Sequence, residues 1–307
     1  MIVRKSTLIH IFVVMLSYFA SAFAIPGGNG RVIGRALANN GRSAPVLVYP
    51  PDGLLAVYKP KGWSSADAVN KVKRAISFGL SSEAKAKSIT TSTAVKAGKF
   101  KIGHGGTLDP LAEGVLVMGV GRATKAMGEY LAGRKEYVAV AKTGTGTDTL
   151  DSTGMETESK EFRHVNRDLI LSKLPMFTGD ILQIPPMYSA LYKDGKRLYE
   201  YARAGIEVER TARSVTAYHI ELLEDARLQF PEYFSLRIQS SGGFYVRSLL
   251  VDLAHAMDTT AHMIALTRTQ QGAFRVEDCL HIGEKIPYES ICENIAHSSA
   301  KVNMQLL

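Results

Sequence analysis

Short apolar runs of strand length are mixed irregularly with helical segments along most of this chain, and this order limits the folds it can adopt. Residues 52–58 (DGLLAVY) and 115–120 are apolar runs, and residues 137–141 alternate with a period of two, so all three predict strands. Apolar spacing and capping residues predict helices at about 65–76, 123–131, 166–176 and 245–257. Because no regular strand–helix–strand repeat is present, we expect an α/β chain of the α+β kind, with a mixed, largely antiparallel sheet and helices on its faces.

This pattern predicts one domain over residues 52–275. Residues 213–223 and 233–239 resemble an antiparallel strand pair. Residues 79–99 (GLSSEAKAKSITTSTAVKAGK) contain few large apolar side chains, which predicts a mobile surface loop. Residues 276–307 are too few for a second domain of the usual size and are expected to form a short C-terminal tail.

Basic residues are unevenly distributed along the chain. The net charge is +8, and residues 1–51 contribute +5, residues 52–150 contribute +7 and residues 151–307 contribute −4. A locally basic body of this kind suits a nucleic-acid-binding face. The two cysteines, Cys279 and Cys292, lie thirteen residues apart without a CxxC pattern, so the sequence predicts neither a metal site nor a disulfide framework.

The first 51 residues have the layout of a targeting sequence. Residues 1–5 are short and basic, residues 8–19 are mostly apolar, and small residues follow, so residues 1–24 are signal-peptide-like. The apolar run is shorter than the ~20 residues of a membrane span, which makes an anchor the weaker alternative. Residues 25–51 lack acids and have a transit-peptide-like composition.

The junction ASAFAIP at residues 20–26 resembles the signal-to-transit junction of proteins in algae with complex plastids. This resemblance implies that the protein enters the plastid stroma, loses its presequence there and has no membrane attachment in its mature form. A mitochondrial location and the secretory pathway are the alternatives.

Residues 101–125 (KIGHGGTLDPLAEGVLVMGVGRATK) contain the clearest chemical signal. Their glycines allow tight turns and close backbone approach. Asp109 precedes Pro110, which favours an extended or turn conformation, and the strand that follows would hold the loop rigidly. On these residues alone, a plain Asp-Pro turn and a catalytic carboxylate both remain open. The glycines match neither GxGxxG nor a Walker A loop, which argues against a nucleotide cofactor.

The segment GHGGTLDPLAEGVL resembles the motif of the TruB family of pseudouridine synthases, whose usual form is GHTGTLDPLATGVL. The resemblance continues through residues 121–125 and, upstream, through residues 52–74. Downstream, KEY at 135–137, GTGTDTLDSTG at 144–154, the block 183–213 and SSGGFYVRSLLVDLA at 240–254 are similar to further segments of the family. The similarity covers about 52–275 and implies the pseudouridine synthase catalytic fold. The short tail at 276–307 is expected to lack the PUA domain that many members of the family carry.

The resemblance implies a tRNA pseudouridine-55 synthase, which isomerises a uridine in the TΨC loop. Asp109 would be the nucleophile, Tyr137 would stack on the flipped uracil, and Arg247 would pair with Asp109. Whether Asp109 attacks the ribose or the base, or promotes elimination, stays open. RNA- or substrate-binding roles are implied for three further residues: His104, Lys125 and Tyr245.

Breaking a glycosidic N–C bond and remaking it as a C–C bond needs a carboxylate, a dry pocket and an aromatic platform for the flipped base. It needs no cofactor and no metal. The expected partners are the TΨC stem-loop of tRNA and, by extension, mRNA, without a guide RNA, and the expected state is a monomer.

Other interpretations fit parts of the sequence. A non-catalytic RNA-binding protein or tRNA chaperone could share the fold, a secreted glycosidase would fit the signal-like start, and a guide-dependent synthase would need a PUA domain. Tyr137 could be a packed strand residue, Arg247 a surface ion pair and His104 a loop cap. The chain also departs from the family pattern at Gly105, where threonine is usual, and at residues 241–244, which lack a lysine.

Overall fold

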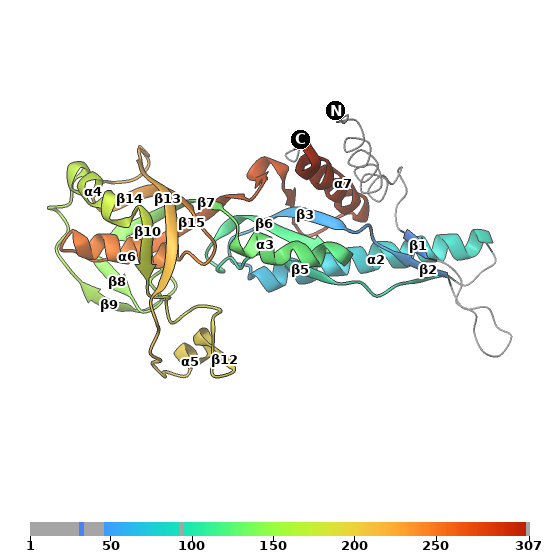
Figure 1. Cartoon of the computed structure of the whole chain (residues 1–307), viewed down its shortest axis with the longest axis horizontal. Coiled ribbons are helices and arrows are strands. Elements are labelled where there is room, and N and C mark those ends of the chain that lie inside the picture. Colours follow the sequence, from blue (N-terminus) through green and yellow to red (C-terminus); the bar gives the residue numbers. More distant parts are fainter. Residues whose placement is uncertain (1–30, 34–45, 92–94, 305–307) are drawn as a thin grey trace, which may run out of the picture.

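A computed structural model describes residues 31–33, 46–91 and 95–304 (Figure 1). The signal-peptide-like segment and most of the transit-like segment lie outside the described residues.

Within the described residues, a ten-stranded sheet forms the framework of the molecule. Neighbouring strands are antiparallel except at two parallel contacts, β15 with β6 and β17 with β3, which confirms the predicted mixed, largely antiparallel sheet. β5 (Ile102–His104) pairs with β6, and β16 (Phe274–Arg275) pairs with β15. The main path runs in the order β10 (Gly179–Gln183), β13 (Arg213–Leu223), β14 (Tyr233–Ser240), β7 (Lys135–Thr143), β15 (Ala261–Gln271), β6 (Glu113–Val120), β3 (Gly53–Lys59) and β17 (Leu280–His281).

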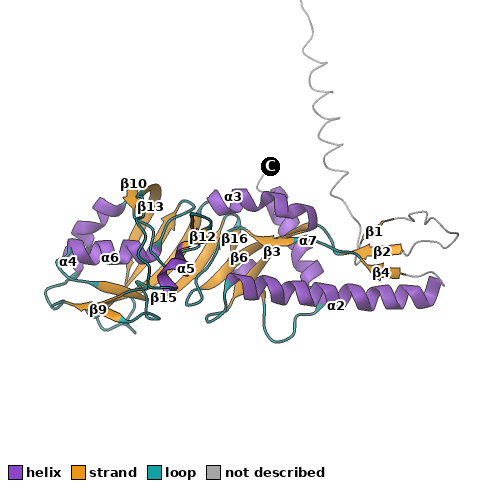
Figure 2. Ribbon diagram, turned by 90° about the horizontal axis from the view of Figure 1, so that it is seen from below, coloured by secondary structure: helices purple, strands orange, loops and turns teal. Residues whose placement is uncertain are grey.

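Helices cover the sheet at both ends of an elongated molecule, as Figures 1 and 2 show. At one end, Leu249 and Leu253 of α6 pack in a core with Leu236 of β14. At the other end, α2 and α7 pack against β3 and β6. The helices are α2 (Ser65–Thr91), α3 (Met127–Ala132), α4 (Arg167–Lys173), α5 (Leu198–Arg203), α6 (Val246–Ala256) and α7 (Tyr288–Met304), with 3-10 turns η1 (Gly121–Ala126), η2 (Leu174–Phe177) and η3 (Val276–Asp278).

The prediction of a mobile loop over residues 79–99 is wrong for its first part, because α2 continues to Thr91. Leu80 and Ala84 extend the buried face of this helix. Gly79 permits close approach to α7, since a Cβ there would lie 2.2 Å from the ring of Tyr288. Alanine, lysine and glutamate favour a helix where tertiary contacts support it, although their composition resembles that of a loop.

Short elements at both ends of the chain join this body. β2 (Val46–Tyr49) precedes the expected domain start at residue 52, and its Val48 is fully buried. β2 pairs with β1 (Arg31–Ile33) and with β4 (Val95–Ala97). In the segment expected to be a tail, β17 pairs with β3, and Ile291 and Ile295 of α7 are buried in the same core.

A small arm is inserted between β10 and β13, the two strands at one edge of the sheet, and projects from the molecule (Figure 1). It consists of the hairpin β11 (Tyr192–Lys193) and β12 (Lys196–Arg197) followed by α5. A second hairpin, β8 (Thr145–Thr147) and β9 (Glu156–Ser159), follows β7. None of the described helices combines the length and apolar character that crossing a bilayer requires.

Candidate active site

The loop between β5 and β6 carries Asp109 and is held from outside by the segment that leads into α2. The hydroxyl of Ser65 accepts a hydrogen bond from the backbone N–H of Leu108 (2.8 Å) and donates to its carbonyl (3.1 Å). The N–H of Gly62 donates to the carbonyl of Pro110 (2.7 Å). These bonds on both sides of Asp109 fix its backbone and therefore the position of its carboxylate.

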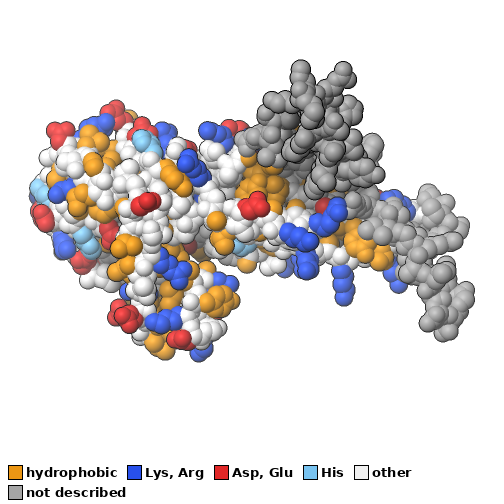
Figure 3. Space-filling view, in the orientation of Figure 1, with side chains coloured by type: hydrophobic (Ala, Val, Ile, Leu, Met, Phe, Trp, Pro, Cys, Tyr) orange, Lys and Arg blue, Asp and Glu red, His pale blue; other side chains and the backbone are white. Residues whose placement is uncertain are grey.

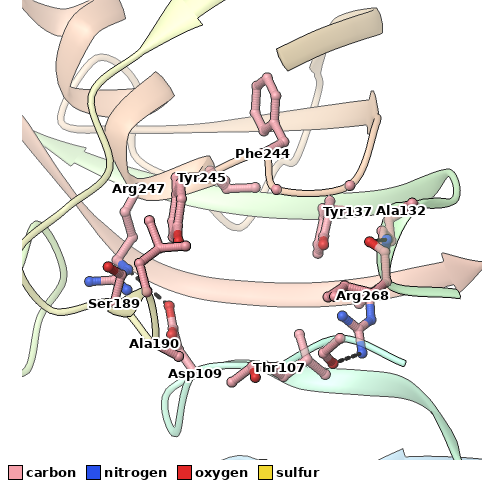
Figure 4. A pocket seen from close by; sticks show the side chains of 18 of the residues that line it. Thr107, Asp109, Ala132, Tyr137, Ser189, Ala190, Phe244, Tyr245, Arg247 and Arg268 are labelled. Atoms are coloured by element: carbon pink, nitrogen blue, oxygen red, sulfur yellow. Dashed lines mark hydrogen bonds and ion pairs between the residues drawn. The ribbon is translucent and has the colours of Figure 1, made fainter. Parts of the chain in front are cut away.

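Arg247 forms an ion pair with Asp109, with 2.9 Å between Nε and Oδ2 (Figure 4). Arg247 lies in the first turn of α6 and is almost completely buried. Its terminal nitrogens donate to the carbonyls of Thr149 and Tyr188, each at 2.8 Å. The guanidinium is therefore held on three sides, and the pairing that the family resemblance implied is present.

A second carboxylate, Asp151, lies behind this pair, 3.9 Å from Nε of Arg247. It is buried and accepts hydrogen bonds from the hydroxyls of Thr149 and Thr153. Burial raises the pKa of Asp109, and the charge of Asp151 raises it further, whereas Arg247 lowers it. About a third of the Asp109 side chain stays open to the cavity, so the carboxylate is both enclosed and reachable.

Asp109 lies where two cavities meet. One has a volume of about 600 Å³ and the other about 780 Å³, and both are lined by His104, Asp109 and Arg247. The first is bounded mainly by the aromatic and apolar residues Tyr137, Phe244, Tyr245 and Leu266. The second extends beneath the arm and is bounded by Ser64, Asp148, Tyr199 and Arg203. Figure 4 shows the two tyrosines on the opposite side of the cavity from Asp109.

The structure brings five of the six predicted site residues together. Tyr137 and Tyr245 line the first cavity, and His104 lines both. His104 accepts a hydrogen bond at Nδ1 from the N–H of Gly106, and burial lowers its pKa. Lys125 is exposed in η1 and lines neither cavity, so it lies apart from the other five.

Arg268 is a cavity residue that the sequence analysis missed. It is 1% exposed, and it donates through Nε to the carbonyl of Val115 (2.6 Å) and through Nη2 to that of Gly106 (3.2 Å). It stands opposite Tyr137 in the β15–β7 register and interacts with the tyrosine hydroxyl. Among the described residues no carboxylate forms a salt bridge with it. Burial lowers the pKa of Arg268, and Tyr137 opposes this shift. The guanidinium is therefore a buried cation, and its removal from water costs free energy.

Three further polar residues near the site were not predicted as site residues. Gln271 donates to the carbonyl of Gly105 (2.6 Å) and accepts from the N–H of Val117 (3.0 Å). Lys135 lines the first cavity, and Lys59 is buried near Asp109; burial lowers the pKa of each lysine to about 8. Lys59 and Lys135 lie in segments that resemble the family, but nothing local in the sequence marks them or Gln271 as buried, because their environment arises only from the tertiary fold.

The described part of the chain contains no cluster of three or more histidine, cysteine or acidic residues that could hold a metal ion. The site is thus a carboxylate–guanidinium pair beside an aromatic wall. Such a site can bind a planar group between aromatic surfaces and bring an ionised carboxylate to it.

Sequence comparisons identify the family of this chain. Residues 93–246 match the model of the TruB family pseudouridylate synthase N-terminal domain. The chain is 41% identical to human pseudouridylate synthase TRUB1 over 251 residues, covering 81% of this chain and 69% of that protein. The mouse protein of the same name is 44% identical, and the match covers 72% of this chain and 63% of the mouse protein. tRNA pseudouridine synthase B of Listeria monocytogenes is 39% identical, and the match covers 76% of this chain and 70% of the bacterial protein.

Among solved structures, the chain is similar to one in a Cbf5–Nop10–Gar1 complex, with a TM-score of 0.51 and 26% identity. The match covers 75% of this chain, which spans about half (52%) of the length of the Cbf5-complex chain. A chain of the archaeal box H/ACA Nop10–Cbf5 complex gives the same TM-score at 25% identity, covering 80% and 58%. The family model, the human relative and the fold agree: this chain belongs to the TruB family of pseudouridylate synthases, which are isomerases.

Proposed function

We propose that this protein is a tRNA pseudouridine-55 synthase that isomerises one uridine of the TΨC loop, with Asp109 as the nucleophile. The observation that carries the proposal is the Asp109–Arg247 pair at the junction of the two cavities, opposite Tyr137. The choice of tRNA rests on relatives named tRNA pseudouridine synthase B, at about 40% identity.

In this reaction the glycosidic N1–C1′ bond breaks, the uracil turns, and its C5 forms a C–C bond to the same ribose carbon. C5 then loses its proton and the freed N1 takes one up, so that the product is an isomer of uridine. The target base must leave its stack, and Tyr137 and Tyr245 provide flat surfaces to receive it. Arg247 holds the Asp109 carboxylate ionised and directed at the nucleotide. The Tyr137 hydroxyl, beside Arg268, is placed to carry the proton in the last step.

The proposal requires no metal, nucleotide or guide RNA. We also propose that the protein acts as a monomer. An mRNA stem-loop that presents the same loop would fit the same cavities.

The test is conversion of an unmodified tRNA transcript by the purified full chain in the presence of EDTA, with pseudouridine mapped by carbodiimide modification and primer extension. Conversion at the TΨC-loop uridine, and none when that uridine is replaced by cytidine, is the expected result. If the unaltered protein binds tRNA without converting it, the protein is instead a non-catalytic RNA-binding protein with the same fold. A requirement for added guide RNA would place it with guided synthases.

We also propose that the N-terminal segment directs the protein to the stroma of a complex plastid. The support is its order: a basic start, an apolar run, the junction at residues 20–26 and an acid-free linker. Because Val48 of β2 is buried in the fold, cleavage that removes the targeting segment would have to occur on the N-terminal side of Val46. Residues 1–45 fused to a fluorescent protein should label the plastid of such an alga, and Phe23→Ala should divert it. Secretion, mitochondrial labelling or cytosolic fluorescence of the unaltered fusion would overturn this location.

A further inference from the structure

α2 and the segments that flank it carry a large positive charge. Residues 61–101 contain nine Lys and Arg but two Asp and Glu, a net charge of +7 in a chain of +8. Both acids have partners: Asp67 accepts from Ser64 at the start of α2, and Glu83 pairs with Lys87. The positive charges of this segment are therefore largely uncompensated.

The two sides of α2 differ sharply. Residues at intervals of four, including Val72, Ile76 and Leu80, are buried in the core with α7. The opposite side exposes Arg74, Phe78 and the polar residues around them. Spacings of three and four place such residues on one face of a helix.

The basic face has three exposed cations on α2 and three more in the segment that returns beside it. β4 and the following residues pack along α2, so both groups belong to one region of the molecule. None of the six forms a salt bridge within the described part of the chain. They are Lys73, Arg74, Lys85, Lys96, Lys99 and Lys101.

This basic face starts at the active site and leads away from it. Ser64, Ser65 and Ala66 line the second cavity, and Ser65 bonds to Leu108, next to Asp109. From there α2 runs for 27 residues, which at 1.5 Å per residue is about 40 Å. Figure 2 shows it extending along one edge of the molecule to β2 and β4, and Figure 3 shows Lys and Arg side chains along the same end of the body.

We propose that this basic face binds the phosphate backbone of the substrate RNA at a distance from the modified loop, and so recognises the body of a folded tRNA. The inference rests on the proposed function and adds a second contact region to it. Uncompensated cations in a row that begins beside a nucleotide cavity are the arrangement that attracts a polyanion. Phe78 is 77% exposed among them and can stack on an unpaired base. A membrane fits less well, because a surface-binding helix needs an apolar stripe and this face exposes one large apolar side chain among the described residues.

The test compares two double variants that each remove two positive charges from the full chain. Arg74→Ala with Lys85→Ala changes the basic face. Arg163→Ala with Lys173→Ala is the matched control in the opposite lobe, near α4. Binding of each protein is measured without turnover, as a function of salt, with a full tRNA transcript and with an isolated TΨC stem-loop.

For full tRNA, the basic-face variant should raise Kd by roughly 10-fold and lower the slope of log K against log salt by about 1.5, at 0.7–0.9 per lost phosphate contact. Its Kd for the stem-loop and its kcat should stay within about threefold of the wild type, because the short RNA reaches little of α2. The control should change neither Kd nor slope.

Unchanged binding of full tRNA, or an equal loss in the control, would overturn the proposal. Binding to vesicles of anionic lipid is measured in parallel, and a variant that loses vesicle binding while it binds full tRNA like the wild type would also overturn it. Failure of the proposed function is recognised separately. In that case the wild-type protein would leave the stem-loop unmodified, while its binding data would still test the basic face.

Discussion

Nε of Arg247 lies 2.9 Å from Oδ2 of Asp109, while both terminal nitrogens of the same guanidinium donate to backbone carbonyls. The three guanidinium nitrogens thus bind three different partners. One orients the carboxylate, and the other two attach α6 to the loops that carry Thr149 and Tyr188. Electrostatics and loop geometry are coupled through one residue.

Asp109→Asn should fold normally, bind tRNA and lose activity by at least about 1000-fold. The substitution keeps the shape of the side chain but removes its nucleophilic charge. Single-turnover conversion of tRNA measures the loss, and a filter-binding assay is the control for RNA affinity. Activity within a few-fold of the wild type would remove Asp109 from its proposed role.

The same variant should be more stable than the wild type at neutral pH. The surroundings raise the pKa of Asp109 above its ordinary 3.8, so the folded state holds its proton more tightly than the unfolded state. The stability contributed by this proton is fully present below the unfolded pKa and is lost as the pH rises through the folded pKa. Tm of Asp109→Asn should therefore exceed that of the wild type at pH 7, and the gap should narrow as the pH is lowered toward about 4. A gap that widens on acidification would contradict the assigned direction.

Arg247→Lys should reduce kcat by roughly 100-fold and also destabilise the protein. Lysine retains the charge, but it cannot contact the carboxylate and two separate carbonyls in a fixed plane. Loss of partners for these buried groups should lower the free energy of unfolding by about 2 kcal/mol. Urea denaturation and single-turnover kinetics measure the two effects. A variant with normal kcat would show that charge alone is sufficient.

Lys59→Met should alter the pH dependence of stability above pH 8. Burial lowers the pKa of Lys59 from 10.5 to about 8, so the unfolded state binds its proton more tightly. The stability that the neutral amine contributes is fully present above pH 10.5 and is lost as the pH falls through about 8. As the pH rises from about 8 to 10.5, the free energy of unfolding of the wild type should therefore increase by about 2 kcal/mol relative to that of Lys59→Met, after allowance for solvent screening. Parallel stability curves for the two proteins would be inconsistent with a depressed pKa.

Arg268→Met should lower kcat by about 10- to 100-fold with little change in KM, because Arg268 positions the Asp109 loop through Gly106 and interacts with Tyr137. A matched control is Arg237→Met on β14, where the arginine is more exposed and pairs with Glu221. Circular dichroism checks the fold of both variants. Equal kcat values for the two would assign Arg268 a purely structural role.

Much of the sheet and part of the site could be predicted from local patterns. Alternation in residues 137–141 and the paired runs at 213–223 and 233–239 correspond to β7, β13 and β14. Asn166 caps α4 by accepting from the N–H of Leu169, as its position before the apolar residues indicated. These features depend on neighbouring residues, which is why the sequence reveals them.

The remaining features depend on contacts that are distant in sequence. α2 continues past residue 79 because α7, some two hundred residues later, supplies its apolar partner. Arg268 is an ordinary strand residue by pattern, and its role arises only where β15 meets β7 and β6. Lys125 illustrates the reverse case: it belongs to the same motif as Asp109 but turns to the surface after β6.

The packing of α2 on α7 also has a consequence for the order of folding during synthesis. α2 ends at Thr91, whereas Tyr288, Ile291 and Ile295, which cover its apolar face, are translated some two hundred residues later. β17, which borders β3, is also translated late. Until these residues leave the ribosome, the nascent chain must therefore keep an apolar helix face and a sheet edge uncovered, where exposed apolar surface and unpaired strand edges favour aggregation.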